Sequence, residues 1–177
     1  MKAGGVGGAK TKTGLYFEGR SDLIEAIKAL PGYEVDKDGA ILFEGSPVAQ
    51  SLKKGALYKF LDAKGVDHKA LLSARLLPDA AVLVFSTKTL YIIEMKFQKV
   101  GGSVDEKLQT SAYKRKQYLR LMEPLKINVE YYYVLSDWFK KDSYRDVLAY
   151  IKEIGCDYFF NTLPLDRLGL PSATGAK

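Results

Sequence analysis

Two groups of charged residues could carry chemistry because they lie within apolar segments. Asp79 stands directly before the segment AAVLVF, and Glu94 and Lys96 lie inside the segment LYIIEMKF. Alternate residues of a strand share a face, so Glu94 and Lys96 project together while Met95 points to the opposite side. A charged side chain in an apolar segment costs free energy of folding unless something neutralises its charge. Two carboxylates with carbonyl and water oxygens suit Mg²⁺, so the residues predict a metal site at Asp79 and Glu94.

This combination favours phosphodiester hydrolysis. A bound Mg²⁺ acidifies a water and stabilises charge on a phosphate, while the Lys96 ammonium positions the nucleophile and assists its deprotonation. Taken singly, Pro78-Asp79 is a common start for a strand, and Glu-x-Lys is a common self-paired exposed face. Their joint occurrence in two neighbouring apolar segments favours the active-site interpretation.

The spacing of the two segments predicts how they pair. We expect strands over residues 80–85 and 90–97, joined as an antiparallel hairpin by a turn at residues 86–89. Facing residues would then have numbers that sum to about 175. This register places Asp79 close to Lys96 and within one or two residues of Glu94.

The rest of the chain follows from hydrophobic periodicity and turn residues. We expect helices over residues 14–30, with Thr13 as a possible N-cap, and over residues 47–63, 69–77, 104–122 and 144–154. Further strands are expected over residues 33–35, 41–43, 129–135 and 157–161. This order predicts one α/β domain over residues 14–177, a sandwich whose central mixed β-sheet is flanked by helices. Residues 1–13, rich in glycine and lysine, are expected to form a flexible basic arm.

The motif resembles the signature of a known family. Pro78-Asp79, fourteen intervening residues and Glu94-Met95-Lys96 are similar to the PD-(D/E)xK motif of restriction-endonuclease-like nucleases. The segments GGVGGAKTKTGLYFEGRSDL, GGSVDEKLQT and FFNTLPLDRLGL also resemble small type II restriction endonucleases. The resemblance implies the restriction-endonuclease-like fold and Mg²⁺-dependent, sequence-specific hydrolysis of double-stranded DNA by a homodimer, with 5′-phosphate ends.

The resemblance also implies roles for individual residues. Asp79 and Glu94 would be metal ligands, and Lys96 the catalytic lysine. Many family members place a further acid near the metal on the first helix, a role that Glu18 fits; an ordinary exposed glutamate is the alternative. Gln98 extends the motif on the same face and could contact phosphate or a metal-bound water.

The charge balance favours an anionic partner, with nucleic acid first. Lysine and arginine number 27 against 21 acidic residues, which leaves a net charge of +6. The N-terminal arm could wrap DNA or could be a solubilising tail, and the basic run after the motif could hold phosphate or be a solvated helix face. Counting the polar residues beside the motif, the candidate DNA-binding residues are Lys10, Lys12, Thr13, Gln98, Lys99, Lys114, Arg115 and Lys116.

Other classes of protein are disfavoured. One cysteine and one histidine cannot form a disulfide or a structural zinc site, and GGVGGAKT lacks the glycine that a phosphate-binding loop requires before its lysine, so no nucleotide cofactor is expected. Without a long apolar segment the sequence predicts a cytoplasmic protein that does not enter a membrane. Two alternatives stay open: a structure-selective nuclease such as a Holliday junction resolvase, and a non-catalytic basic DNA-binding module.

Overall fold

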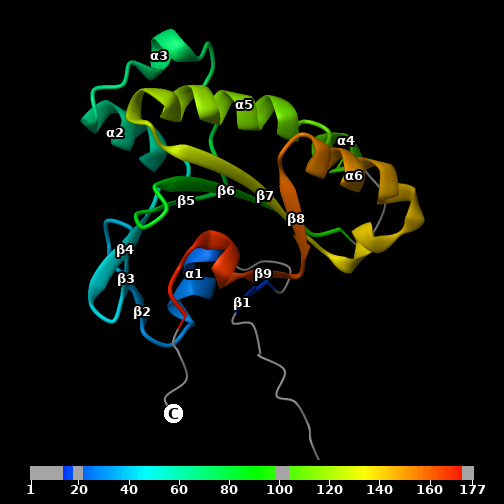
Figure 1. Cartoon of the computed structure of the whole chain (residues 1–177), viewed down its shortest axis with the longest axis horizontal. Coiled ribbons are helices and arrows are strands. Elements are labelled where there is room, and N and C mark those ends of the chain that lie inside the picture. The colour runs from blue at the N-terminus through cyan, green and yellow to red at the C-terminus, as the bar shows by residue number, and fades with distance from the viewer. Residues whose placement is uncertain (1–13, 18–21, 99–103, 173–177) are drawn as a thin grey trace, which may run out of the picture.

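A mixed β-sheet forms the centre of the computed structural model, which describes residues 14–17, 22–98 and 104–172 (Figure 1). Its seven strands are β2 (Tyr33–Val35), β3 (Ala40–Phe43), β4 (Ser46–Ser51), β5 (Ala80–Val84), β6 (Thr89–Lys96), β7 (Asn128–Leu135) and β8 (Asp157–Phe160). They lie side by side in sequence order. Pairing is antiparallel from β2 to β6 and parallel from β6 to β8.

Helices cover both faces of this sheet. They are α1 (Leu23–Lys28), α2 (Ala56–Ala63), α3 (His68–Leu71), α4 (Val104–Leu108), α5 (Ser111–Met122) and α6 (Arg145–Glu153), with 3-10 helices η1 (Glu123–Leu125), η2 (Asp137–Lys140), η3 (Asp142–Tyr144) and η4 (Leu165–Leu168). In Figure 1, α2 and α5 lie over one face, and α1 with the C-terminal η4 lies over the other. The expected α/β architecture with a central mixed sheet and flanking helices is confirmed. Across the described residues, no helix has the length and apolarity needed to cross a membrane.

Side-chain alternation in the central strands feeds two hydrophobic cores. Ile92, Tyr131 and Tyr133 pack into the core beneath α5, whereas Ile93 and Tyr132 pack into the core beneath α1. All three tyrosines of the run are buried. Their alternation between faces would suggest that one is exposed, but helices cover both faces of β7, as is usual for parallel strands.

The N-terminal helix is shorter than expected because its first residues form a strand. Residues Gly14–Tyr16 form β1, which pairs antiparallel with β9 (Thr162–Pro164). The two backbones approach so closely that a Cβ atom at Gly14 would lie 2.6 Å from Thr162 Cγ2. The helix begins at Leu23 instead, and Asp22 rather than Thr13 is its N-cap.

Replacing Asp22 by Ala is expected to lower the free energy of unfolding by about 1 kcal/mol, because the cap is lost. The Asp22 carboxylate accepts a hydrogen bond from the backbone N–H of Ile24 at 2.9 Å and pairs with Lys53 at 2.6 Å. Urea denaturation measures the effect. The control is Glu25→Ala, which removes an exposed pair with Lys28 and an acid from the first turn of the same helix but leaves the cap in place. Equal losses from both substitutions would contradict the cap.

The second expected helix is also divided. Its first part is strand β4, which enters the sheet through a bulge: Ile41 faces Ala49, whereas the next residue, Leu42, faces Pro47. Proline lacks an N–H group, so bulges and strand starts tolerate it, and the pairing with β5 begins only at Ala49. The helical part, α2, therefore starts nine residues after Pro47.

The helix expected over residues 104–122 has a break between α4 and α5. The Thr110 hydroxyl donates to the Lys107 carbonyl at 2.8 Å, and the Ser111 hydroxyl donates to the Leu108 carbonyl at 3.1 Å. Such side-chain bonds compete with the regular helical ladder. The break lets α5 lie along the sheet directly above β7.

Candidate active site

The β5–β6 hairpin brings the motif residues onto one face of the sheet. Ala80 faces Ile93, so continuing the register by one residue sets Asp79 opposite Glu94. The hairpin loop is Phe85–Lys88, one residue earlier than expected, and the register is therefore two residues away from the expected one. A shift of two changes the cross-strand neighbour but leaves every side chain on its predicted face.

Glu94 lies beneath α5 between two lysines. Its side chain is only 8 % exposed; Oε2 lies 2.8 Å from Lys96 Nζ, and Oε1 lies 2.7 Å from Lys114 Nζ. Burial alone would raise the pKa of this carboxyl, but the hydrogen bonds and charges of the two ammonium groups outweigh burial and hold the pKa below its usual range. Glu94 is therefore a carboxylate at neutral pH.

The lowered pKa predicts how stability depends on pH. A carboxyl whose pKa is lower in the folded than in the unfolded chain stabilises the fold at pH values above the pKa of the unfolded chain. For a glutamate that ordinary pKa is 4.5. This contribution is lost as the pH falls through the folded-state pKa. Thermal melts between neutral and acid pH should therefore show a steeper acid loss for the wild type than for Glu94→Gln, which does not titrate. Parallel curves would contradict the ion pairs at Glu94.

Tyr118 links the two acids electrostatically. It extends from α5 and is buried, whereas Asp79 is exposed at the start of β5. Burial raises the pKa of the Tyr118 hydroxyl, and the negative charges of Glu94 and, more weakly, Asp79 raise it further. Both carboxylates thus act electrostatically on one phenol, in agreement with the register that sets Asp79 opposite Glu94.

Tyr131 places a second phenol beside Glu94. Burial and the Glu94 charge raise its pKa, so the group stays neutral. Its buried hydroxyl interacts with Glu94 and Tyr133, and both interactions raise the same pKa, although neither has the geometry of a regular hydrogen bond. Tyr131 is therefore a neutral polar neighbour of the buried carboxylate.

The site offers few possible ligands for a metal ion. Among residues 14–17, 22–98 and 104–172, no group of three or more His, Cys, Asp and Glu side chains could hold a metal. The site therefore offers two carboxylates, Asp79 and Glu94, and the third expected acid, Glu18, lies outside the described residues. Mg²⁺ commonly binds through one or two carboxylates and keeps several waters, so this donor set fits it.

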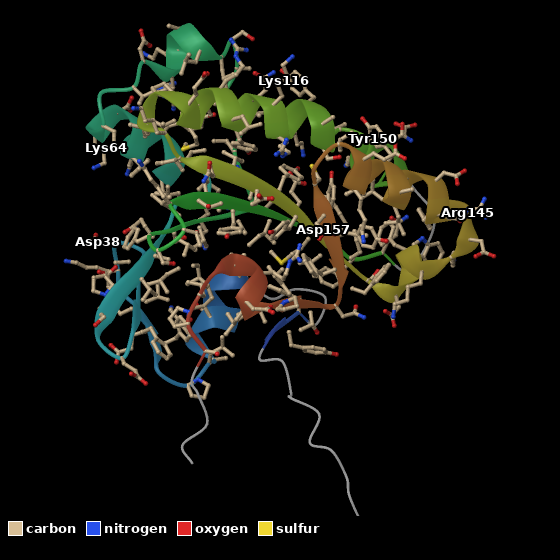
Figure 2. The ribbon with its side chains drawn as sticks, viewed as in Figure 1. Asp38, Lys64, Lys116, Arg145, Tyr150 and Asp157 are labelled. Atoms are coloured by element: carbon tan, nitrogen blue, oxygen red, sulfur yellow. The ribbon has the colours of Figure 1, made fainter. Side chains whose placement is uncertain are left out.

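The expected DNA-binding residues fall into several groups. Lys10, Lys12, Thr13 and Lys99 lie outside the described residues. Gln98 follows β6, and its backbone N–H donates to the Ser136 hydroxyl at 3.2 Å, which ties the ends of β6 and β7 together. Lys116 is exposed and projects from α5 away from the sheet (Figure 2).

The other two expected DNA-binding residues of α5, Lys114 and Arg115, do not lie on its outer face as expected. Lys114 contacts Glu94, and Arg115 packs beside Gly155, where an added Cβ would lie 3.4 Å from its Cζ. Helical spacing could have revealed the inward position of Lys114, because it precedes the buried Tyr118 by one turn and Leu121 by two. Lys114 and the two tyrosines are the residues near Glu94 that the motif alone does not identify.

Compared with known proteins, the chain matches no family model, no curated protein and no solved structure. The chemistry of the site itself is therefore the basis for a function. The site combines an exposed carboxylate, a buried and ionised carboxylate, and a lysine on one strand pair. In that arrangement the two carboxylates could hold a hard divalent cation, with an ammonium group beside it.

Proposed function

We propose that this protein is a Mg²⁺-dependent endonuclease of the PD-(D/E)xK class, acting on double-stranded DNA as a type II restriction endonuclease. One observation carries the proposal: Asp79 and the Glu94–Lys96 ion pair lie on adjacent antiparallel strands and on one face, next to two buried tyrosines. The same residues carry the resemblance of the sequence to that class.

Each residue has a separate role in this proposal. Asp79 and Glu94 would hold Mg²⁺, which when bound acidifies a water and stabilises charge on the phosphate. Lys96 orients the attacking water and assists its deprotonation, because its ammonium lies on the same carboxylate that would bind the metal. Tyr118 and Tyr131 remain neutral and limit the access of bulk water to Glu94.

The proposal includes a homodimer. One such site cuts one strand, so a two-fold pair of subunits on a palindromic sequence would cut both strands. The net charge of +6 supports an anionic partner, and the exposed Lys107, Lys116 and Arg120 of α4 and α5 are available to phosphates.

Digestion of linear phage DNA tests the proposal. With Mg²⁺ the protein should give discrete fragments whose ends carry 5′-phosphates, and EDTA should stop the reaction. Cleavage of branched DNA alone would replace the restriction endonuclease with a structure-selective nuclease. DNA binding that weakens with salt, without any hydrolysis in Mg²⁺, would contradict the enzyme and favour a binding module.

A further inference from the structure

We propose that Lys114 acts as a built-in counter-ion that competes with the divalent cation for Glu94 and so weakens metal binding by the DNA-free protein. The inference rests on the proposed metal site and extends it to a residue outside the motif. Lys114 lies on α5, twenty residues after Glu94, and reaches the carboxylate from above the sheet.

The two lysines occupy different oxygens of Glu94. Lys96 lies at Oε2 and Lys114 at Oε1, both at the short distances of charge-assisted hydrogen bonds. Each oxygen of the buried carboxylate therefore already has a cation. A divalent ion that binds Glu94 meets at least one ammonium group at close range, and the like charges repel.

Lys114 is the lysine that can withdraw. Lys96 shares strand β6 with Glu94, and its side chain is 16 % exposed, whereas the Lys114 side chain is 28 % exposed and comes from a separate element. Its long side chain can turn toward solvent without any change in the sheet. Lys96, in contrast, stays beside the Glu94 carboxylate both without and with a bound metal ion.

The net charge of the site also indicates that Lys114 weakens metal binding. Asp79 and Glu94 together carry two negative charges, and Lys96 and Lys114 together carry two positive charges. The local charge is therefore close to zero before a metal binds. Removing the Lys114 charge leaves a net negative site, which attracts a dication more strongly. The ion pair between Lys114 and Glu94 therefore lowers the affinity of the two carboxylates for a metal ion.

Calorimetric titration with Mn²⁺ in the absence of DNA tests this role without reference to cleavage. Lys114→Met should bind Mn²⁺ about tenfold more tightly than wild type, which corresponds to the loss of one charge-assisted bond. Lys114→Arg keeps the charge and should bind like wild type. Lys116→Met removes an exposed charge from the same helix and serves as the matched control.

The possible outcomes separate the two proposals. If Lys114→Met binds Mn²⁺ no more tightly than Lys116→Met, Lys114 is not a competitor and the metal site still stands. If neither wild type nor any variant binds Mn²⁺, the metal site itself is wrong. Lys114→Gln provides a second uncharged variant should circular dichroism show that Lys114→Met is unfolded, and it should also bind more tightly.

Discussion

Asp79→Asn is expected to lower Mg²⁺-dependent DNA cleavage by about 10³-fold and to leave the stability of the fold unchanged. The side chain is exposed and, within the described part of the chain, makes no hydrogen bond or salt bridge. The substitution therefore removes a negative charge without breaking a structural contact. Surface changes of this kind alter the free energy of unfolding by less than about 0.5 kcal/mol.

Cleavage rates and urea denaturation of the same preparation separate the two effects. Asp146→Asn is the matched control, because Asp146 is a highly exposed aspartate on α6 whose side chain, among the residues that the structure describes, pairs only with its exposed neighbour Arg145. It should cleave like wild type. Wild-type cleavage by Asp79→Asn, or an activity loss that merely follows unfolding, would contradict the metal-binding role of Asp79.

Glu94→Leu is expected to abolish cleavage and also to lower the free energy of unfolding by about 2 kcal/mol. The substitution leaves the ammonium groups of Lys96 and Lys114 side by side beneath α5 without the carboxylate that pairs with both of them. Removing one partner of a fully buried pair costs roughly 3–5 kcal/mol, and the partial exposure of both lysines reduces that figure. Urea denaturation measures the loss.

A double substitution provides the control for this prediction. Adding Lys114→Met to Glu94→Leu removes one of the two unpaired charges and should recover part of the stability, while cleavage stays absent. If the double variant loses as much free energy of unfolding as Glu94→Leu and Lys114→Met lose together, the Glu94–Lys114 pair contributes nothing to stability. Glu94→Gln, which keeps hydrogen-bond acceptor and volume, should be destabilised less than Glu94→Leu.

The central strands could be predicted from sequence because their signal is local. The segments of β5 and β6 are apolar and rich in β-branched residues, and a short turn joins them. Alternation then placed Glu94 and Lys96 on one face and Met95 on the other, where the structure has Met95 packed against the opposite core. The error of two residues in register came from the turn, because hydrophobic periodicity does not determine the geometry of a turn.

The errors in the flanking elements have non-local causes. Gly14–Tyr16 is a strand only because Thr162–Pro164, at the other end of the chain, pairs with it. Pro47 is typical of a helix start, yet here it occupies a bulge in a strand whose later residues pair with β5. Such pairings depend on tertiary packing, which outweighs local propensity.

In the candidate site, too, local sequence predicts some features and tertiary packing determines the others. The motif identifies the residues of one hairpin, but the environment of Glu94 depends on how α5 lies over the sheet. Lys114 contacts Glu94, and Tyr118 lies within the influence of the Glu94 charge, only because that helix packs on β7. The run Lys114-Arg115-Lys116 was expected to be one basic face, whereas helix geometry turns Lys114 toward the carboxylate and Lys116 toward solvent.

Cleavage of supercoiled plasmid by wild type and by Lys96→Ala tests the catalytic centre most directly. With Mg²⁺, wild type should convert the plasmid to nicked and linear forms, whereas Lys96→Ala should be slower by about 10²–10⁴-fold. Far-UV circular dichroism of both proteins controls for folding. No cleavage by wild type, or equal cleavage by both proteins, would contradict a nuclease centre built from Asp79, Glu94 and Lys96.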